Sequence, residues 1–237
     1  MERFLIKQKE KIAYIIMNNK ENKHDIVFAN EFLEALNYCI SDKTINSIII
    51  TSSDEKNFSQ GIDVDWVHKN LKEKNYDIVK KFLYKINEIF EKIIFSCVPT
   101  IAQINGHAFG NGALLACACD FRFSRKDKGF FCFPEVDIGI PFLPSMIEFS
   151  KKAINYQFYQ QIVFTGKRCI ADELEKEGVI LKAAASLEEL ELTTFEFAKT
   201  LNKNRSIYQK LKNRIFANIK EAFEKDKQYI ENLDIFV

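Results

Sequence analysis

Residues 99–112 read PTIAQINGHAFGNG, a short apolar segment followed by three glycines in seven residues. Thr100–Ile104 is rich in β-branched side chains, as in a strand buried on both faces. The small residues of Ala113–Cys119 then continue as a helix. A second stretch has the same plan, because the strand expected at Ser47–Thr51 leads through a polar loop to FSQGID, residues 58–63. Two buried strands therefore each end in a glycine-containing turn.

On either side of these turns, the spacing of apolar residues predicts an α/β protein. Strands are expected at residues 3–9, 11–18, 121–124 and 130–133, and helices at residues 26–41 and 75–95. After residue 143 helical periodicity dominates, over residues 154–164, 187–202 and 206–223. We expect an α/β core over residues 1–180 and a helical C-terminal region over residues 181–237 within the same structural unit.

Composition narrows the classes of partner. The 237 residues carry 34 basic and 33 acidic side chains, a net charge of +1, so no strong field favours nucleic acid. No uninterrupted apolar run approaches the length of a membrane span, and the N-terminus lacks the hydrophobic block of a signal peptide. The C-terminus, DIFV, carries no peroxisomal tripeptide. A cytoplasmic protein that binds neither nucleic acid nor membrane is expected. The six cysteines form no C-x-x-C pair and are expected to be buried small hydrophobes.

The two glycine turns are suited to binding an anionic oxygen. Backbone amides exposed at such turns, one of them at a helix N-terminus, point their N–H groups at a ligand. Neither turn matches a P-loop or a G-x-G-x-x-G fingerprint, so a nucleotide fold is not indicated. Taken alone, each turn is weak evidence, and an ordinary strand-to-helix connection is the favoured interpretation.

The combination of FSQGID (58–63), PTIAQINGHAFG (99–110) and DFR (120–122) resembles the crotonase, or enoyl-CoA hydratase/isomerase, superfamily. The likeness runs from Arg3 to about Val179, and FPE (133–135) and TGK (165–167) fall in register. Within the superfamily, RKDKGF (125–130) followed by EVDIG (135–139) is similar to the enoyl-CoA delta isomerases of plants and animals. The resemblance implies a crotonase-like ββα spiral core and a homotrimer or a dimer of trimers.

The resemblance also implies a site for an acyl-CoA thioester. Its carbonyl would lie between the backbone amides of Ile62 and Asn111, a position where many relatives have glycine. Gly61, Gly110 and the segment Asp63, Val64 and Asp65 would adjoin the thioester and the start of the acyl chain. Lys23 and His24 match the region that lines the pantetheine and adenine. Coenzyme A is part of the substrate, and neither a further cofactor nor a metal is expected.

The number of carboxylates at the turns separates two chemistries. Hydratases of this superfamily use two glutamates to activate water, and the first position holds Leu114 here. The second position holds Glu135, in an apolar stretch expected to raise its pKa and strengthen it as a base. One carboxylate suffices for an allylic shift, because it can take a proton from C2 and return it to C4. We therefore expect a 3-enoyl-CoA isomerase with Glu135 as base and acid. The alternatives are a hydratase, another enolate-forming crotonase and a non-catalytic acyl-CoA sensor.

Other polar residues are assigned secondary roles. His107 is expected to be packed or backbone-bonded, Asp120 to be buried and structural, and Trp66 to wall the acyl pocket or pack on a helix. Asp137 is a minor candidate, since strand alternation would place it on the face of Glu135. The three cations of one C-terminal helix could reach a neighbouring subunit's nucleotide, but solvated helix charges are the favoured interpretation for Lys210, Lys212 and Arg214.

Overall fold

The computed structural model describes residues 3–234, and its largest feature is a six-stranded sheet. The first two strands pair antiparallel, and each later strand runs parallel to its neighbour. The order of the strands across the sheet is the same as their order along the chain. The strands are β1 (Phe4–Lys9), β2 (Ile12–Met17), β4 (Ser47–Ser52), β7 (Thr100–Ile104), β9 (Phe121–Arg125) and β11 (Ala183–Ala184). Every residue of β4 and β7 is buried, as expected for strands covered on both faces.

Two smaller sheets lie beside the large one. The first contains β5 (Asn57–Ser59), β8 (His107–Phe109) and β10 (Phe131–Cys132), and the second pairs β3 (Lys23–His24) with β6 (Gly61–Ile62). The chain passes from a strand of the large sheet to a strand of a small sheet, then through helical segments back to the large sheet. Repetition of this path for β4–β5, β7–β8 and β9–β10 produces a ββα spiral, which confirms the expected fold class.

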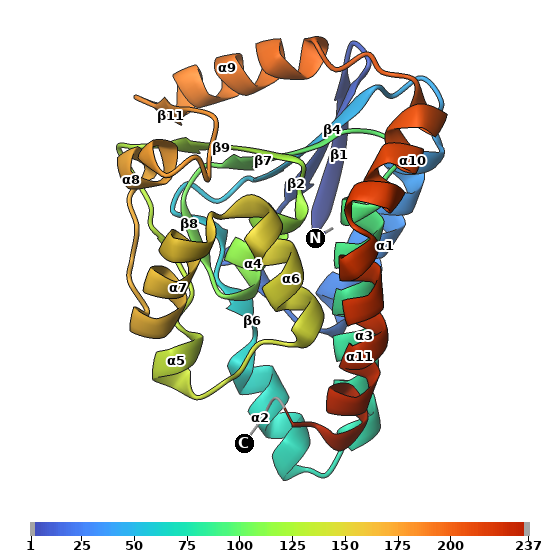
Figure 1. Cartoon of the computed structure of the whole chain (residues 1–237), viewed down its shortest axis with the longest axis vertical. Coiled ribbons are helices and arrows are strands. Elements are labelled where there is room, and N and C mark those ends of the chain that lie inside the picture. The colour runs from blue at the N-terminus through green and yellow to red at the C-terminus, as the bar shows by residue number, and fades with distance from the viewer. Residues whose placement is uncertain (1–2, 235–237) are drawn as a thin grey trace.

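Helices cover both faces of the large sheet (Figure 1). Helix α9 (Leu187–Lys199) packs on β4, β7 and β9 from one side. The opposite side carries the larger core, to which α1 (Ile26–Ser41), α3 (Tyr76–Ile94), α4 (Asn111–Ala118) and α6 (Pro144–Ala153) contribute. The remaining helices are α2 (Val64–Lys72), α5 (Glu135–Ile138), α7 (Tyr156–Thr165), α8 (Ala171–Lys176), α10 (Arg205–Ile215) and α11 (Ala217–Asn232). Helix α11 packs against α6 and α3, so the C-terminal helices join the core of the spiral.

The structure differs from the sequence expectation at several elements. Helix α2 begins directly after the first glycine turn, where no helix was predicted although Val64, Val67 and Leu71 have helical spacing. The segment after Phe133 forms the one-turn helix α5 rather than a continued strand. Strand β11 lies beyond residue 180 yet pairs with β9, so the large sheet extends past the expected boundary of the core.

Within residues 3–234, none of the helices is both long enough and apolar enough to cross a lipid bilayer. The final tripeptide, on which the expected lack of a peroxisomal signal depends, lies outside the described residues. Five of the six cysteines are buried and Cys97 is half-buried, in line with their expected role as small apolar side chains.

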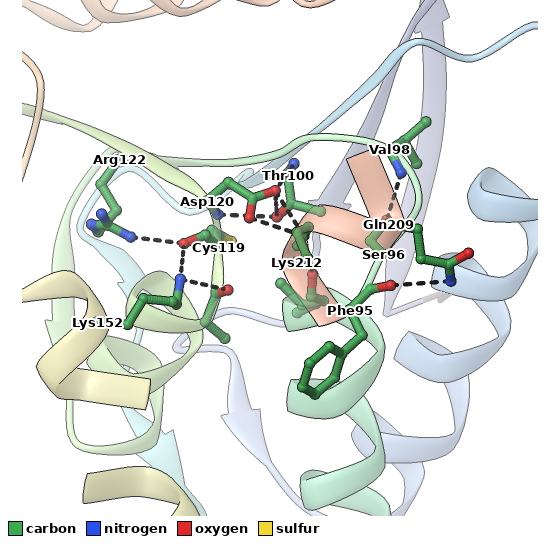
Figure 2. Close-up of polar contacts among 12 residues, drawn as sticks. Phe95, Ser96, Val98, Thr100, Cys119, Asp120, Arg122, Lys152, Gln209 and Lys212 are labelled. Atoms are coloured by element: carbon green, nitrogen blue, oxygen red, sulfur yellow. Dashed lines mark hydrogen bonds and ion pairs between the residues drawn. The ribbon is translucent and has the colours of Figure 1, made fainter. Parts of the chain in front are cut away.

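Helix α4, which follows the second glycine turn, is anchored at its C-terminal end by cations (Figure 2). Nζ of Lys152 donates to the carbonyls of Cys119 at 2.8 Å and Ala118 at 3.3 Å. The Arg122 guanidinium donates to the same Cys119 carbonyl at 2.8 Å. Carbonyl groups at a helix C-terminus carry the negative end of the helix dipole, so both cations stabilise this end of α4. The helix is thereby fixed at the end opposite the glycine turn.

Asp120 and Lys212 form a buried ion pair beside this helix end (Figure 2). Their charged atoms lie 2.9 Å apart, and Asp120 also accepts from the backbone and hydroxyl of Thr100. The structural role expected of Asp120 is confirmed. The interpretation of Lys212 as a solvated charge is wrong, because α10 packs on the end of α3 and leaves it 4% exposed. Lys210 and Arg214 are exposed, as expected.

Candidate active site

The two glycine turns pack directly against each other. A Cβ atom built on Gly61 would lie 2.6 Å from the carbonyl oxygen of Phe109 and 2.8 Å from the backbone nitrogen of Asn111. In the other direction, a Cβ on Gly112 would lie 2.4 Å from the carbonyl oxygen of Ser59. Real Cβ atoms do not approach backbone atoms so closely, so only glycine allows the two turns to meet. The turns, separated by about fifty residues in the sequence, therefore form one site.

The backbone amide of Asn111 lies at the start of helix α4. Gly110 is the N-cap with φ of +51°, and the first amide that bonds back to its carbonyl is that of Leu114, at 3.0 Å. The amide of Asn111 therefore has no acceptor within the helix and carries the positive end of the helix dipole. The amide of Ile62 lies in β6, one residue before Asp63, which caps helix α2 by accepting from the amide of Trp66.

Glu135 is directed toward the second turn. It is the first residue of α5, and its Oε1 lies 3.1 Å from the position that a Cβ on Gly110 would occupy. Its Oε2 is buried and has no hydrogen-bond partner among residues 3–234. Burial raises the pKa of this carboxyl from 4.5 to about 8, as the apolar surroundings in the sequence led us to expect. A carboxylate with this pKa, beside Gly110 at the start of helix α4, is suited to act as a general base near neutral pH.

A small apolar cavity of about 70 Å³ lies between Glu135 and the turns. Leu114 of helix α4 is 1% exposed and forms part of the cavity wall. It stands at the position where the resemblance to hydratases would require a second glutamate. Other residues of the wall are Gln60, Ile62, Val64, Leu83, Gly110, Asn111, Pro134, Ile138, Ile140, Pro141, Phe142 and Met146. The cavity therefore combines apolar side chains with one carboxylate and the residues that carry both amides, as binding sites for small ligands commonly do.

Several of the expected site residues do not line this cavity. Asp63 serves as a helix cap, and Asp65 is exposed in the first turn of α2. Asp137 does not share a strand face with Glu135, because both lie on the one-turn helix α5, and its carboxylate is adjacent to Gly166. Trp66 packs on Phe82 of helix α3, with ring centroids 5.3 Å apart, which is one of the two roles expected of it.

Of the two basic residues before helix α1, Lys23 lies at the surface and His24 lies in the interior. Lys23 is partly exposed beside Gly61 in the β3–β6 pair and forms an ion pair with Glu21 at 3.2 Å. The ring of His24 is 2% exposed, and both of its nitrogens are hydrogen-bonded, to Ser59 and Asn111. The His24 side chain therefore points inward, because alternation along β3 turns it away from the surface. That this segment lies beside coenzyme A stays a prediction. His107 accepts from the amide of Phe130 at 3.2 Å, which confirms its backbone-bonded role.

The same arrangement of strands and helices is found in solved structures. An enoyl-CoA isomerase of Mycobacterium tuberculosis superposes with a TM-score of 0.86 at 21% identity, covering 98% of both chains. An enoyl-CoA hydratase of Bacillus halodurans gives a TM-score of 0.85 at 20% identity, covering 99% of this chain and 97% of its own. These similarities place the fold in the crotonase class.

The sequence comparison is more specific than the fold. The model of the enoyl-CoA hydratase/isomerase family matches residues 7–236, and this chain belongs to that family. An enoyl-CoA delta isomerase of Arabidopsis thaliana is 30% identical over 166 residues, which cover 66% of each chain, just under two thirds. A short-chain-enoyl-CoA hydratase of Clostridium acetobutylicum is 26% identical over 211 residues, which cover 87% of this chain and 78% of the relative.

The burial of Glu135 has a consequence for stability. Its pKa of about 8 in the folded chain exceeds the ordinary value of 4.5, so between these pH values the folded state holds a proton that the unfolded chain has lost. The free energy of unfolding therefore falls as the pH rises through this window. Glu135→Gln cannot ionise and should be more stable than the parent by about 2–4 kcal/mol at pH 9, with little difference at pH 4.5. Urea denaturation at both pH values measures this; equal differences at the two would contradict it.

Proposed function

We propose that this protein shifts the double bond of a 3-enoyl-CoA thioester to give trans-2-enoyl-CoA. The observation that supports this assignment is that Glu135 is the one carboxylate among the described residues that line the cavity. It lies beside Gly110, the residue before Asn111, and Leu114 stands where a second carboxylate would be needed for hydration. The thioester would lie in the cavity between the turns with its carbonyl oxygen toward the amides of Ile62 and Asn111. Its acyl chain would contact the apolar wall.

In this mechanism Glu135 removes a proton from C2 of the substrate. The electron pair of the broken C–H bond enters the thioester carbonyl, whose oxygen becomes an enolate oxyanion. Two preorganised N–H donors in an apolar site stabilise that charge, each by about 2.7–4 kcal/mol in comparable oxyanion holes. The protonated carboxyl then delivers the same proton to C4, and the double bond moves from C3–C4 to C2–C3. No atom is gained or lost, and Glu135 returns to its starting state.

The raised pKa of Glu135 helps both steps. A base with a pKa of about 8 binds the transferred proton more tightly than an exposed glutamate, yet it can still release it to the dienolate. Ionised Glu135 is the form that accepts the proton. We therefore expect kcat/KM for isomerisation to rise about tenfold per pH unit below an apparent pKa near 8 and to level off above it. A pH–rate profile between pH 5 and 10 measures this, and a profile that is flat from pH 6 to 9 would contradict the assignment of Glu135 as the base.

Hydration is the second candidate, because the curated relatives include hydratases as well as isomerases. The two are separated by following the products of the parent protein. With a 3-hexenoyl-CoA substrate, isomerisation forms a conjugated enoyl thioester and increases its ultraviolet absorbance. With crotonyl-CoA, hydration destroys the same chromophore. We expect kcat/KM for isomerisation to exceed that for hydration; faster loss of the crotonyl-CoA chromophore would favour the hydratase.

Leu114 offers a way to add the missing carboxylate. Leu114→Glu would place a second acid in the cavity wall, where it could position and activate a water molecule. We expect the ratio of hydration to isomerisation to rise about tenfold or more in this variant. Leu114→Gln is the matched control, because glutamine has the length of glutamate and is polar but cannot act as a base. This variant should keep the ratio of hydration to isomerisation near that of the parent. An unchanged ratio in a folded Leu114→Glu protein would show that Leu114 does not determine the outcome.

A further inference from the structure

The side chain of His24 lies between the two glycine turns. It is in strand β3, which pairs with β6 so that His24 is opposite Ile62. Its Nε2 is 2.9 Å from the Ser59 hydroxyl in the first turn, and its Nδ1 is 2.8 Å from Nδ2 of Asn111 in the second. The ring is stacked on Phe28 of helix α1, with centroids 4.0 Å apart, so it is held on its face as well as at its edge.

The position of the proton on this ring follows from its partners. Nδ2 of Asn111 can only donate, so Nδ1 of His24 is the acceptor and the ring proton is on Nε2. Nε2 then donates to the Ser59 hydroxyl. This hydroxyl donates its own hydrogen bond to the carbonyl of Asn22 at 2.8 Å and also accepts from the Gly61 amide at 3.0 Å. Burial lowers the pKa of His24 to about 3, so the ring keeps this neutral form at physiological pH.

These bonds connect the two segments that carry the proposed amide donors. Gly61, whose amide is bonded to Ser59, directly precedes Ile62. Asn111 supplies the other amide itself, and its side-chain oxygen is buried without a partner among residues 3–234. His24 is thus the hydrogen-bond anchor of the Asn111 side chain within the described structure. A substitution at His24 would keep both backbone N–H groups but would change the distance between them.

We propose that His24 is a positioning residue for the oxyanion hole, setting the separation of the Ile62 and Asn111 amides through Ser59 and the Asn111 side chain. This inference rests on the proposed function, because it assumes that both amides bind one thioester oxygen. Two donors stabilise one oxyanion fully only when both lie about 2.7–3.1 Å from it. An error in placement of about 1 Å can lower a rate by about 10²-fold. His24 itself touches neither substrate nor reacting atoms in this scheme.

The test compares three variants with the parent protein. His24→Leu removes both hydrogen bonds and keeps an apolar side chain. In His24→Asn, Oδ1 can take the place of ring Nδ1 as acceptor for Asn111. Phe32→Leu is the control for loss of core packing, since Phe32 is a fully buried aromatic on the same helix as Phe28 and stacks on Phe4. Each is assayed for kcat and KM in isomerisation. Each is also titrated with 2,4-hexadienoyl-CoA, whose absorbance shifts to longer wavelength when its carbonyl is polarised.

For His24→Leu we expect kcat to fall about 10- to 100-fold with KM within about threefold of the parent, and the red shift of the bound probe to fall by half or more. His24→Asn should recover part of both. Phe32→Leu should lower the melting temperature without changing kcat or the red shift. A folded His24→Leu protein with the parent's kcat and red shift would overturn the inference.

The probe also separates this inference from the proposed function. If the parent protein shifts the probe's absorbance but does not isomerise 3-enoyl-CoA, the proposed function fails. The role of His24 is then still tested by comparing the red shift in His24→Leu with that in the parent. If the parent protein binds the probe and does not shift its absorbance, no oxyanion hole exists for His24 to position, and the inference is overturned.

Discussion

Glu135→Gln is expected to lower kcat for isomerisation by about 10²–10⁴-fold, the usual range for loss of a general base. The amide keeps the size of the side chain but cannot accept the C2 proton. Since the binding groups in the cavity remain, the dissociation constant for an unreactive acyl-CoA should change by less than about threefold. Steady-state kinetics and a binding titration on the same preparation measure the two effects.

Asp137→Asn is the matched control for this variant. Asp137 lies on the same one-turn helix, but it is exposed and its carboxylate faces Gly166 rather than the cavity. Its kcat should stay within about twofold of the parent. Retention of more than a tenth of the parent's kcat in Glu135→Gln would show that another group is the base.

Gly61→Ala is expected to lower kcat/KM by about 10²–10³-fold, the loss associated with one oxyanion-hole donor. The new methyl group would lie 2.8 Å from the very nitrogen of Asn111 that is proposed to bind the substrate, and 2.6 Å from the Phe109 carbonyl. One of the two turns must move to relieve this contact, so the two amides can no longer share one oxygen. The kinetic loss should therefore be accompanied by a smaller red shift of bound 2,4-hexadienoyl-CoA.

Gly178→Ala isolates the backbone contribution to that effect. Gly178 has φ of +70°, close to the +80° of Gly61, but a Cβ there would meet nothing within 4 Å. Both substitutions carry the strain of a side chain at positive φ, while only Gly61→Ala disturbs the amides. We expect Gly178→Ala to be destabilised with full activity. An equal loss of activity in both variants would attribute the effect of Gly61→Ala to general destabilisation.

Much of this architecture could be predicted from the sequence because its signals are local. The β-branched run at β4, the alternation in β2 and the helical spacing of α1 each reflect burial of one face or two. Strand β1 is predicted from the same alternation, although it buries only Phe4 and leaves its last four residues exposed. The glycine turns marked the site, since a positive φ or a close backbone approach demands glycine there. The apolar neighbours of Glu135 similarly indicated its raised pKa.

The remaining features depend on contacts between distant residues. The burial of Lys212 arises only when α10 lies across the end of α3, and nothing near Lys212 in the sequence distinguishes it from Lys210. The inward orientation of His24 depends on the pairing of β3 with β6, two strands of only two residues each. Helix α5 is a single turn, too short to show a period. Pairing and packing across the chain, rather than local propensity, determine these three features.

In the proposed mechanism, one carboxylate and two backbone amides surround the same thioester carbonyl. A crystal structure with bound acetoacetyl-CoA tests it most directly. We expect the thioester oxygen about 2.7–3.1 Å from both the Ile62 and Asn111 nitrogens, with a Glu135 oxygen within about 3.5 Å of C2. A thioester oxygen bound away from either nitrogen, or a Glu135 carboxylate turned away from C2, would contradict the account.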